Sequence, residues 1–122
     1  MEMIEKDTFQ ADFTILANGS PVDLTDIDLW FTVKDDKSLP DSNALVQKTL
    51  IDSVESGIII LGSPSAGRCR VEFLPADTAN LSFGNKDSLK FFWDIQLKNS
   101  ANQIFTFAEG VLIINKGVTQ SS

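Results

Sequence analysis

The stretch LKFFWDIQL, at positions 89–97, carries the clearest structural signal in this sequence. Its large apolar side chains occupy every second position: Leu89, Phe91, Trp93, Ile95 and Leu97. In an extended chain, alternate side chains point to the same side, whereas a helix would scatter them around its axis. β-Branched and aromatic residues also favour strands. We therefore predict a half-buried β-strand whose apolar face needs a second layer of structure to cover it.

The composition limits the class of protein. A chain of 122 residues suits one domain, and 43% hydrophobic residues is ordinary for a globular protein. Ten Lys and Arg against 17 Asp and Glu give a net charge of -7, which disfavours nucleic acids and anionic membranes as partners. The start, MEMIEKD, lacks an apolar run of signal-peptide length, and no segment is long enough to span a bilayer. We expect a protein that is made and kept in cytoplasm.

Cys69 is the only cysteine, and the chain has no histidine. These counts exclude an intrachain disulfide, a zinc site built from Cys and His, and histidine-based catalysis. Cys69 alternates with Val71 and Phe73, so we interpret it as a small core residue. The alternative is a reactive thiol whose pKa is lowered by Arg68 and Arg70, but no base lies nearby in sequence to activate it.

The rest of the chain is typical of short strands separated by turns. Asn18 and Gly19 indicate a tight turn, and the polar segment 35–43 contains Pro40 and indicates a surface loop. Pro75, with Asp77 as a possible cap, indicates a single helical turn near 75–81 that crosses between two sheets. Further strands are predicted at 8–15, 27–34, 44–51, 58–61, 67–74 and 104–115.

The last predicted strand, 104–115, is apolar enough to lie inside a sheet, and Gly110 is a candidate bulge. About seven or eight short antiparallel strands with one helical turn are typical of an all-β sandwich. A small barrel would give a similar pattern and stays open as an alternative. No repeat or linker divides the chain, so we expect a single domain over 1–117 and a polar tail at 118–122.

Two sets of carboxylates are candidates for chemistry. Asp23, Asp26 and Asp28 could hold calcium, but an EF-hand loop would need a central glycine and a closing glutamate. We interpret them as turn caps and one solvated strand residue. Asp94 and Glu109 could form the carboxylate pair of a glycoside hydrolase, although paired acids on adjacent strands also arise by chance. We expect no catalytic residue, no metal ligand and no cofactor.

Large apolar side chains are also predicted on the outer face. If the alternation holds, Trp30 and Phe92 point away from the core, and exposed apolar patches mark contact surfaces. Loops of this chain could cover them instead, since lone exposed apolar residues are common. We predict a candidate protein interface at Trp30 and Phe92, together with Asp94 and Gln96, the even-numbered neighbours of Phe92.

Several segments carry a family resemblance in their order along the chain. The most specific are the turn NG-x-PVDLT, the helical turn DTA-x-L, and the strand WDIQL answered by EG. They lie within FTILANGSPVDL, IDLWFTVK, ALVQKTL, SGIIIL, GRCRVEFLPADTANL, FFWDIQL and FTFAEGVLII, which together span 13–114. This order resembles the immunoglobulin-like domain at the start of phage baseplate upper proteins and related small phage tail proteins. The chain departs from that family at 99–102, where members commonly have glycine.

The resemblance implies an immunoglobulin-like β-sandwich that docks to other virion proteins in many symmetric copies, without catalysis. Such a protein is made in the host cytoplasm and resides in the virion. Two other functions stay open. One is a carbohydrate-binding or adhesion sandwich that stacks Trp30, Phe92 or Trp93 on sugar rings of a host surface. The other is a capsid decoration protein. The absence of tyrosine favours assembly over surface recognition, because binding surfaces are often rich in Tyr.

Overall fold

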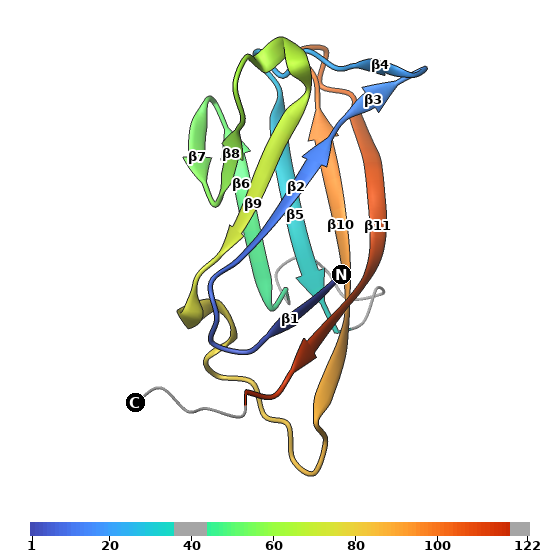
Figure 1. Ribbon diagram of the computed structural model, residues 1–122. Coiled ribbons are helices and arrows are strands. Elements are labelled where there is room, and N and C mark those ends of the chain that lie inside the picture. Colours follow the sequence, from blue (N-terminus) through green and yellow to red (C-terminus); the bar gives the residue numbers. More distant parts are fainter. Residues whose placement is uncertain (36–43, 118–122) are drawn as a thin grey trace.

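The computed structural model describes residues 1–35 and 44–117. A six-stranded sheet and a three-stranded sheet lie face to face, and a two-stranded hairpin extends from one end (Figure 1). The six-stranded sheet has the order β1 (Glu2–Ile4), β11 (Ile104–Asn115), β10 (Ser88–Lys98), β5 (Asp28–Lys34), β6 (Val46–Ile51) and β7 (Val54–Ser56). The three-stranded sheet has the order β2 (Phe9–Thr14), β9 (Arg68–Phe73) and β8 (Ile58–Ile60), and the hairpin joins β3 (Leu16–Ala17) to β4 (Ser20–Pro21). The protein is all-β, as its sequence predicts.

Strand β10 contains the stretch 89–97 and lies inside the six-stranded sheet. It pairs antiparallel with β11 on one side and with β5 on the other. Phe91, Ile95 and Leu97 are buried, and Leu89 and Trp93 pack against the core. The predicted alternation is therefore confirmed, and the second layer that it requires is the three-stranded sheet.

Aromatic rings hold the centre of the core between the two sheets. Phe31 of β5 stacks on Trp93 of β10 with ring centroids 5.7 Å apart, and it meets Phe73 of β9 edge-on at 5.8 Å. Phe13 of β2 approaches Trp93 to 5.5 Å. Burying a large apolar side chain contributes about 1.5–3 kcal/mol, and each aromatic pair adds about 0.5–1.5 kcal/mol. These aromatic contacts join the two sheets.

The predicted tight turn at Asn18 and Gly19 is confirmed. Asn18 and Gly19 both have positive φ in the hairpin between β3 and β4. Asn102 also has positive φ, 61°, in the hairpin between β10 and β11. Asparagine tolerates this left-handed conformation, so the hairpin forms without a glycine at this position. The segment between β8 and β9 contains the short 3-10 turn η2 (Pro64–Ala66).

The predicted helical turn is the 3-10 turn η3 (Pro75–Thr78), which crosses from β9 to β10. The Asp77 carboxylate accepts a hydrogen bond from the Leu74 backbone N–H at 2.7 Å, as a cap does. The same carboxylate pairs with the Lys48 ammonium of β6 at 2.7 Å. Asp77 thus caps the 3-10 turn that follows β9 and ties this turn to the six-stranded sheet.

The number of strands and one strand pairing differ from the prediction. The described residues form eleven strands rather than about seven or eight, and β1 pairs parallel with β11. β1, β3, β4 and β7 are too short to leave an alternating pattern in the sequence. Only their neighbours in space make them strands.

The predicted bulge at Gly110 is wrong. Gly110 lies in register opposite Trp93, and a Cβ there would come within 2.9 Å of the indole ring. Glycine at this position makes room for the ring. The ladder shifts earlier in β11, where Ile95 pairs with Ala108 and Gln96 pairs with Thr106, so Phe107 is the extra residue.

Two predicted segments fall outside the described residues. They are the loop with Pro40, of which 36–43 is not described, and the polar tail at 118–122. Within 1–35 and 44–117, no helix has both the length and the apolar character needed to cross a membrane.

Candidate functional site

The predicted interface residues lie together on the outer face of the six-stranded sheet. Gln96 of β10 is opposite Trp30 of β5, and Asp94 and Phe92 occupy the next outward positions of β10. All of them are partly buried, and neither Trp30 nor Phe92 belongs to the core cluster. Their outward orientation is confirmed, and the role of this face as an interface stays a prediction.

A small hollow of about 140 Å³ lies on the same face, between β5, β10 and β11. Asp94 and Glu109 both line it and are direct cross-strand neighbours, so the structure brings this carboxylate pair together. Lys34 lines the hollow as well. Sites for small molecules usually measure about 300–1,000 Å³, which makes this hollow too small for a sugar ring and an attacking water. The pair gives no support to glycoside hydrolysis.

The other candidate acidic residues, Asp23, Asp26 and Asp28, lie in or beside turns. The Asp23 carboxylate accepts hydrogen bonds from the backbone N–H and the hydroxyl of Thr25, at 2.9 and 2.7 Å. Asp28 accepts the Asp52 backbone N–H at 3.0 Å, and Asp26 has positive φ in a turn. Within the described ranges, no group of three or more potential ligands could hold a metal ion.

Cys69 is a core residue, with 1% of its surface exposed. Burial, with a smaller contribution from the negative charge of Asp12, raises the pKa of its thiol to about 11. Arg70 does not serve the thiol, because its guanidinium donates to both Asp12 carboxylate oxygens at 2.8 and 3.1 Å. The interpretation as a reactive thiol is wrong, since the sulfur is inaccessible and protonated at neutral pH.

The structure shows an open sheet edge that the sequence did not predict. β1 pairs with β11 only over 113–115, and Met1 adds backbone bonds to Val111 and Ile113. No other described strand pairs with β11 from this side, so 104–110 is an edge of the sheet rather than its interior. Edge backbone N–H and C=O groups are a template for pairing with another extended chain.

An apolar pocket of about 380 Å³ adjoins this edge. Leu16 and Ala17 of the β3–β4 hairpin line one side, and Leu97, Phe105 and Phe107 line the other. Phe105 pairs with the buried Leu97 and therefore sits on the inner face, yet 51% of its surface is exposed. No residue of the three-stranded sheet lines the pocket, and the β3–β4 hairpin lies near this end of β11 (Figure 1). The layers are open here.

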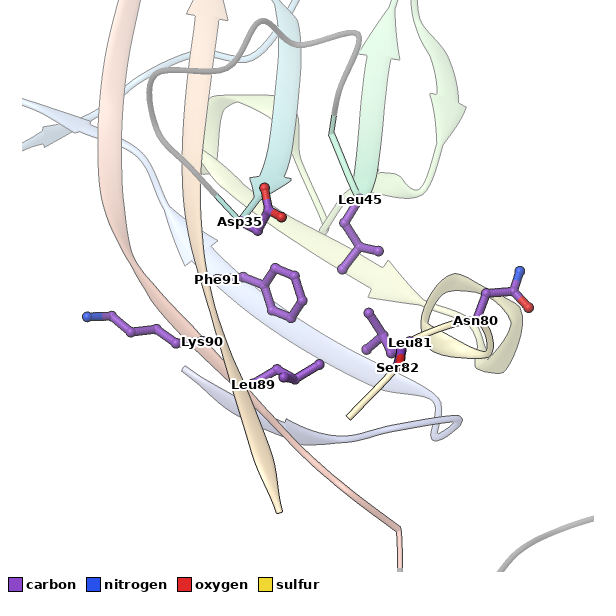
Figure 2. A pocket seen from close by; sticks show the side chains of 8 residues that line it. All are labelled: Asp35, Leu45, Asn80, Leu81, Ser82, Leu89, Lys90 and Phe91. Atoms are coloured by element: carbon purple, nitrogen blue, oxygen red, sulfur yellow. The ribbon is translucent and has the colours of Figure 1, made fainter. Parts of the chain in front are cut away.

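A second pocket, of about 390 Å³, lies at the opposite end of the molecule. Figure 2 shows Leu45, Leu81, Leu89 and Phe91 pointing toward one another across it. Its rim at Asp35 adjoins residues 36–43, which are outside the described part of the chain. We assign no function to this pocket.

In comparisons with known proteins, no family model and no curated protein matches this chain. The resemblance to phage baseplate domains therefore rests on the ordered motifs alone. The residues that sequence reasoning missed are those of the open edge, above all Phe105 and Phe107, and Glu109 was singled out only as a possible catalytic acid. The one signal that could have found them is the run IFTF, which is apolar yet follows directly after the polar hairpin 99–103.

Proposed function

We propose that this protein is a structural module of a phage tail or baseplate that docks to other virion proteins and catalyses no reaction. The observation that carries the docking role is the open edge 104–110 with an apolar pocket beside it. An open backbone edge and an apolar pocket together suit a protein chain better than a small polar substrate.

The ordered motifs suggest which type of β-sandwich this is and which proteins are its partners. We propose an immunoglobulin-like β-sandwich, supported by the two facing sheets and by the 3-10 turn that crosses between them at the DTA-x-L motif. The partners are other virion proteins, which the module meets in symmetric copies, and its location is the virion.

The outer face with Trp30, Phe92, Asp94 and Gln96 offers a second contact in such an assembly. If symmetric copies meet through this face, the double substitution Trp30→Ser and Phe92→Ser should weaken self-assembly measured by light scattering. The matched control is Val54→Ser, which removes an apolar side chain of β7 that is 65% exposed. Assembly unchanged by the double substitution would remove this face from the proposal.

Antibody labelling of purified phage particles tests the proposed function directly. Electron microscopy should show label on the tail or baseplate of intact particles, at positions repeated by the symmetry of that structure. Label on the capsid surface would favour a decoration protein. Particles that carry no label, and in which mass spectrometry finds no peptide of this chain, would contradict the proposal.

Recognition of a carbohydrate is the second candidate function, and the structure reduces the number of aromatic residues that could stack on a sugar. Trp93 is unavailable for stacking on a sugar, because its ring packs against Phe31 and Phe13 in the core. Of the three aromatic residues predicted to stack on a sugar, Trp30 and Phe92 are left. The Lys90 ammonium already lies 5.4 Å from the Phe92 ring centroid. Clear binding of the isolated protein to one class of glycan on an array would favour this function over assembly.

A further inference from the structure

We infer that the open edge of β11 binds an extended segment of a different protein, which joins the six-stranded sheet as an added strand. The segment carries apolar side chains at alternate positions and a lysine or arginine next to Glu109. This inference names the kind of partner for the docking role and rests on that proposed function. Three properties of the edge support it: its backbone, its pocket and its charge.

The backbone of the edge is oriented for pairing. Met1 donates to the Val111 carbonyl and accepts from the Ile113 N–H, so odd-numbered residues here turn their peptide groups away from β10. Peptide groups alternate along an antiparallel strand, so those of Glu109 also turn outward. The peptide groups of Thr106, beyond the bulge, also turn outward. Thr106 pairs with Gln96 and Glu109 pairs with Asp94, and because Asp94 and Gln96 are two residues apart on β10, their partners have the same orientation. An extended chain satisfies such groups, whereas a helix satisfies its own.

The pocket lies where side chains of an added strand would enter. Alternate side chains of a strand paired to β11 point to the inner face of the sheet, the side on which Phe105 and Phe107 line the pocket. The hairpin residues Leu16 and Ala17 close its far wall. The pocket therefore selects a segment with apolar residues at every second position, and an apolar side chain there would also cover the exposed part of Phe105.

The charge distinguishes a foreign segment from a second copy of this chain. The sequence IFTFAEG at 104–110 has no lysine and no proline, the residues that commonly protect edges, and its one charge is the exposed Glu109. Asp94 lies directly opposite Glu109 on β10, and Lys34 lines the same hollow, so the charge that the edge strand itself presents is that of Glu109. A second copy would bring another Glu109 and another net charge of -7, whereas a basic segment is attracted.

Binding of a synthetic peptide tests the inference. The probe is a short peptide of alternating valine and threonine with one central lysine among the threonines, and the control peptide has glutamate in place of that lysine. The full chain should bind the lysine peptide at least about tenfold more tightly, since tenfold corresponds to only ~1.4 kcal/mol and a charge pair plus a removed repulsion can supply it. Glu109→Lys should reverse the preference. Equal binding of both peptides, or no binding, would overturn the inference.

Two substitutions locate the bound peptide on the edge. Thr106→Pro removes one outward N–H and should weaken binding about tenfold, whereas Thr106→Val keeps the N–H and should bind normally. Phe105→Ser reduces the pocket wall without opening the core and should weaken binding as well, which keeps the test decisive if the proline variant fails to fold. Binding unchanged in Phe105→Ser would contradict a site at this edge.

The oligomeric state and the particle label separate the possible failures. Size-exclusion chromatography with light scattering should show no dimer that depends on the edge. A dimer that forms in the natural chain and is lost in Thr106→Pro would show that a second copy occupies the edge. A chain that is labelled in virions but does not bind the lysine peptide would keep the proposed function and overturn this inference. A chain that binds the peptide but is absent from virions would overturn the phage role and leave the edge site standing.

Discussion

The two ends of β11 have similar apolar sequences and opposite surroundings. At the C-terminal end, Leu112 and Ile114 are 0% exposed, and β1 pairs along the outer edge. At the N-terminal end, Ile104 is 60% exposed and Phe105 is 51% exposed, and no described strand pairs along that edge. The strand itself sets which face a side chain takes. Whether that side chain is buried depends on the neighbours that the rest of the chain provides.

The largest expected effect is a difference in stability between the two ends. Leu112→Ala should lower the free energy of unfolding by about 2–5 kcal/mol, because it leaves a cavity in a closed core. Phe105→Ala should lower it by about 1 kcal/mol or less, because much of the ring is already in water. Urea unfolding of both variants checks this. Equal losses would mean that the open end is in fact covered.

Cys69, on β9 of the three-stranded sheet, is as fully buried as the C-terminal end of β11. The unfolded chain loses its thiol proton near the ordinary pKa of 9.0, but the folded chain keeps it until about 11. Stability is therefore unaffected below pH 9 and declines as the pH rises toward 11, by about 2–3 kcal/mol in total. Urea midpoints across this range should show the decline for the natural chain and not for Cys69→Ala. Labelling of native Cys69 by a thiol reagent at neutral pH would contradict its burial.

Gly110 marks the boundary between the two ends. Gly110→Ala should cost about 1–3 kcal/mol, because the new Cβ would lie 2.9 Å from Trp93 indole atoms and the ring must move. The matched test is the same substitution in a Trp93→Phe background, where the ring is smaller. That background also removes an indole N–H that has no acceptor among the described residues. If thermal unfolding shows the same cost in both backgrounds, the close contact with Trp93 is not its cause.

The smallest effect is expected at the exposed ion pair between Asp12 of β2 and Arg70 of β9. The hydrogen bonds and charge of Arg70 hold the pKa of Asp12 below its usual value of 3.8. The pair therefore contributes stability near neutral pH, and this contribution is lost as the pH falls below 3.8 through the folded-state pKa. Because both groups are exposed, Asp12→Asn should change the thermal midpoint only slightly at neutral pH and not at all at low pH. A difference that grows on acidification would contradict this sign.

Much of the fold could be predicted because strand alternation is a local property. The apolar positions of 89–97, the Asn18-Gly19 turn and the Asp77 cap depend on residues within one element or one turn. The burial of Cys69 follows from the same alternation in β9. For these residues, the chain on either side supplies most of the physical reason for the structure.

The rest depends on contacts between distant parts of the chain. β1 is a strand only because β11 lies beside it, although β1 and β11 stand at opposite ends of the sequence. The role of Gly110 depends on the Trp93 ring across the ladder, so its sequence neighbours suggested a bulge instead. The open edge at 104–110 reflects where β1 stops, and the apolar run IFTF does not by itself show that no strand pairs beside it. The outward direction of Trp30 and Phe92 was predictable, but the pocket beside Phe105 was not.

Amide hydrogen exchange along β11 tests the central claim most directly, since it compares the two ends within one strand. In the free chain at neutral pH, the Ile113 amide should exchange slowly because it donates to the Met1 carbonyl, and the Thr106 and Glu109 amides should exchange quickly because they face the open edge. Adding the lysine peptide should slow Thr106 and Glu109 and leave Ile113 unchanged. Thr106 and Glu109 amides that are as protected as Ile113 in the free chain would show that the edge is already covered and would contradict the account.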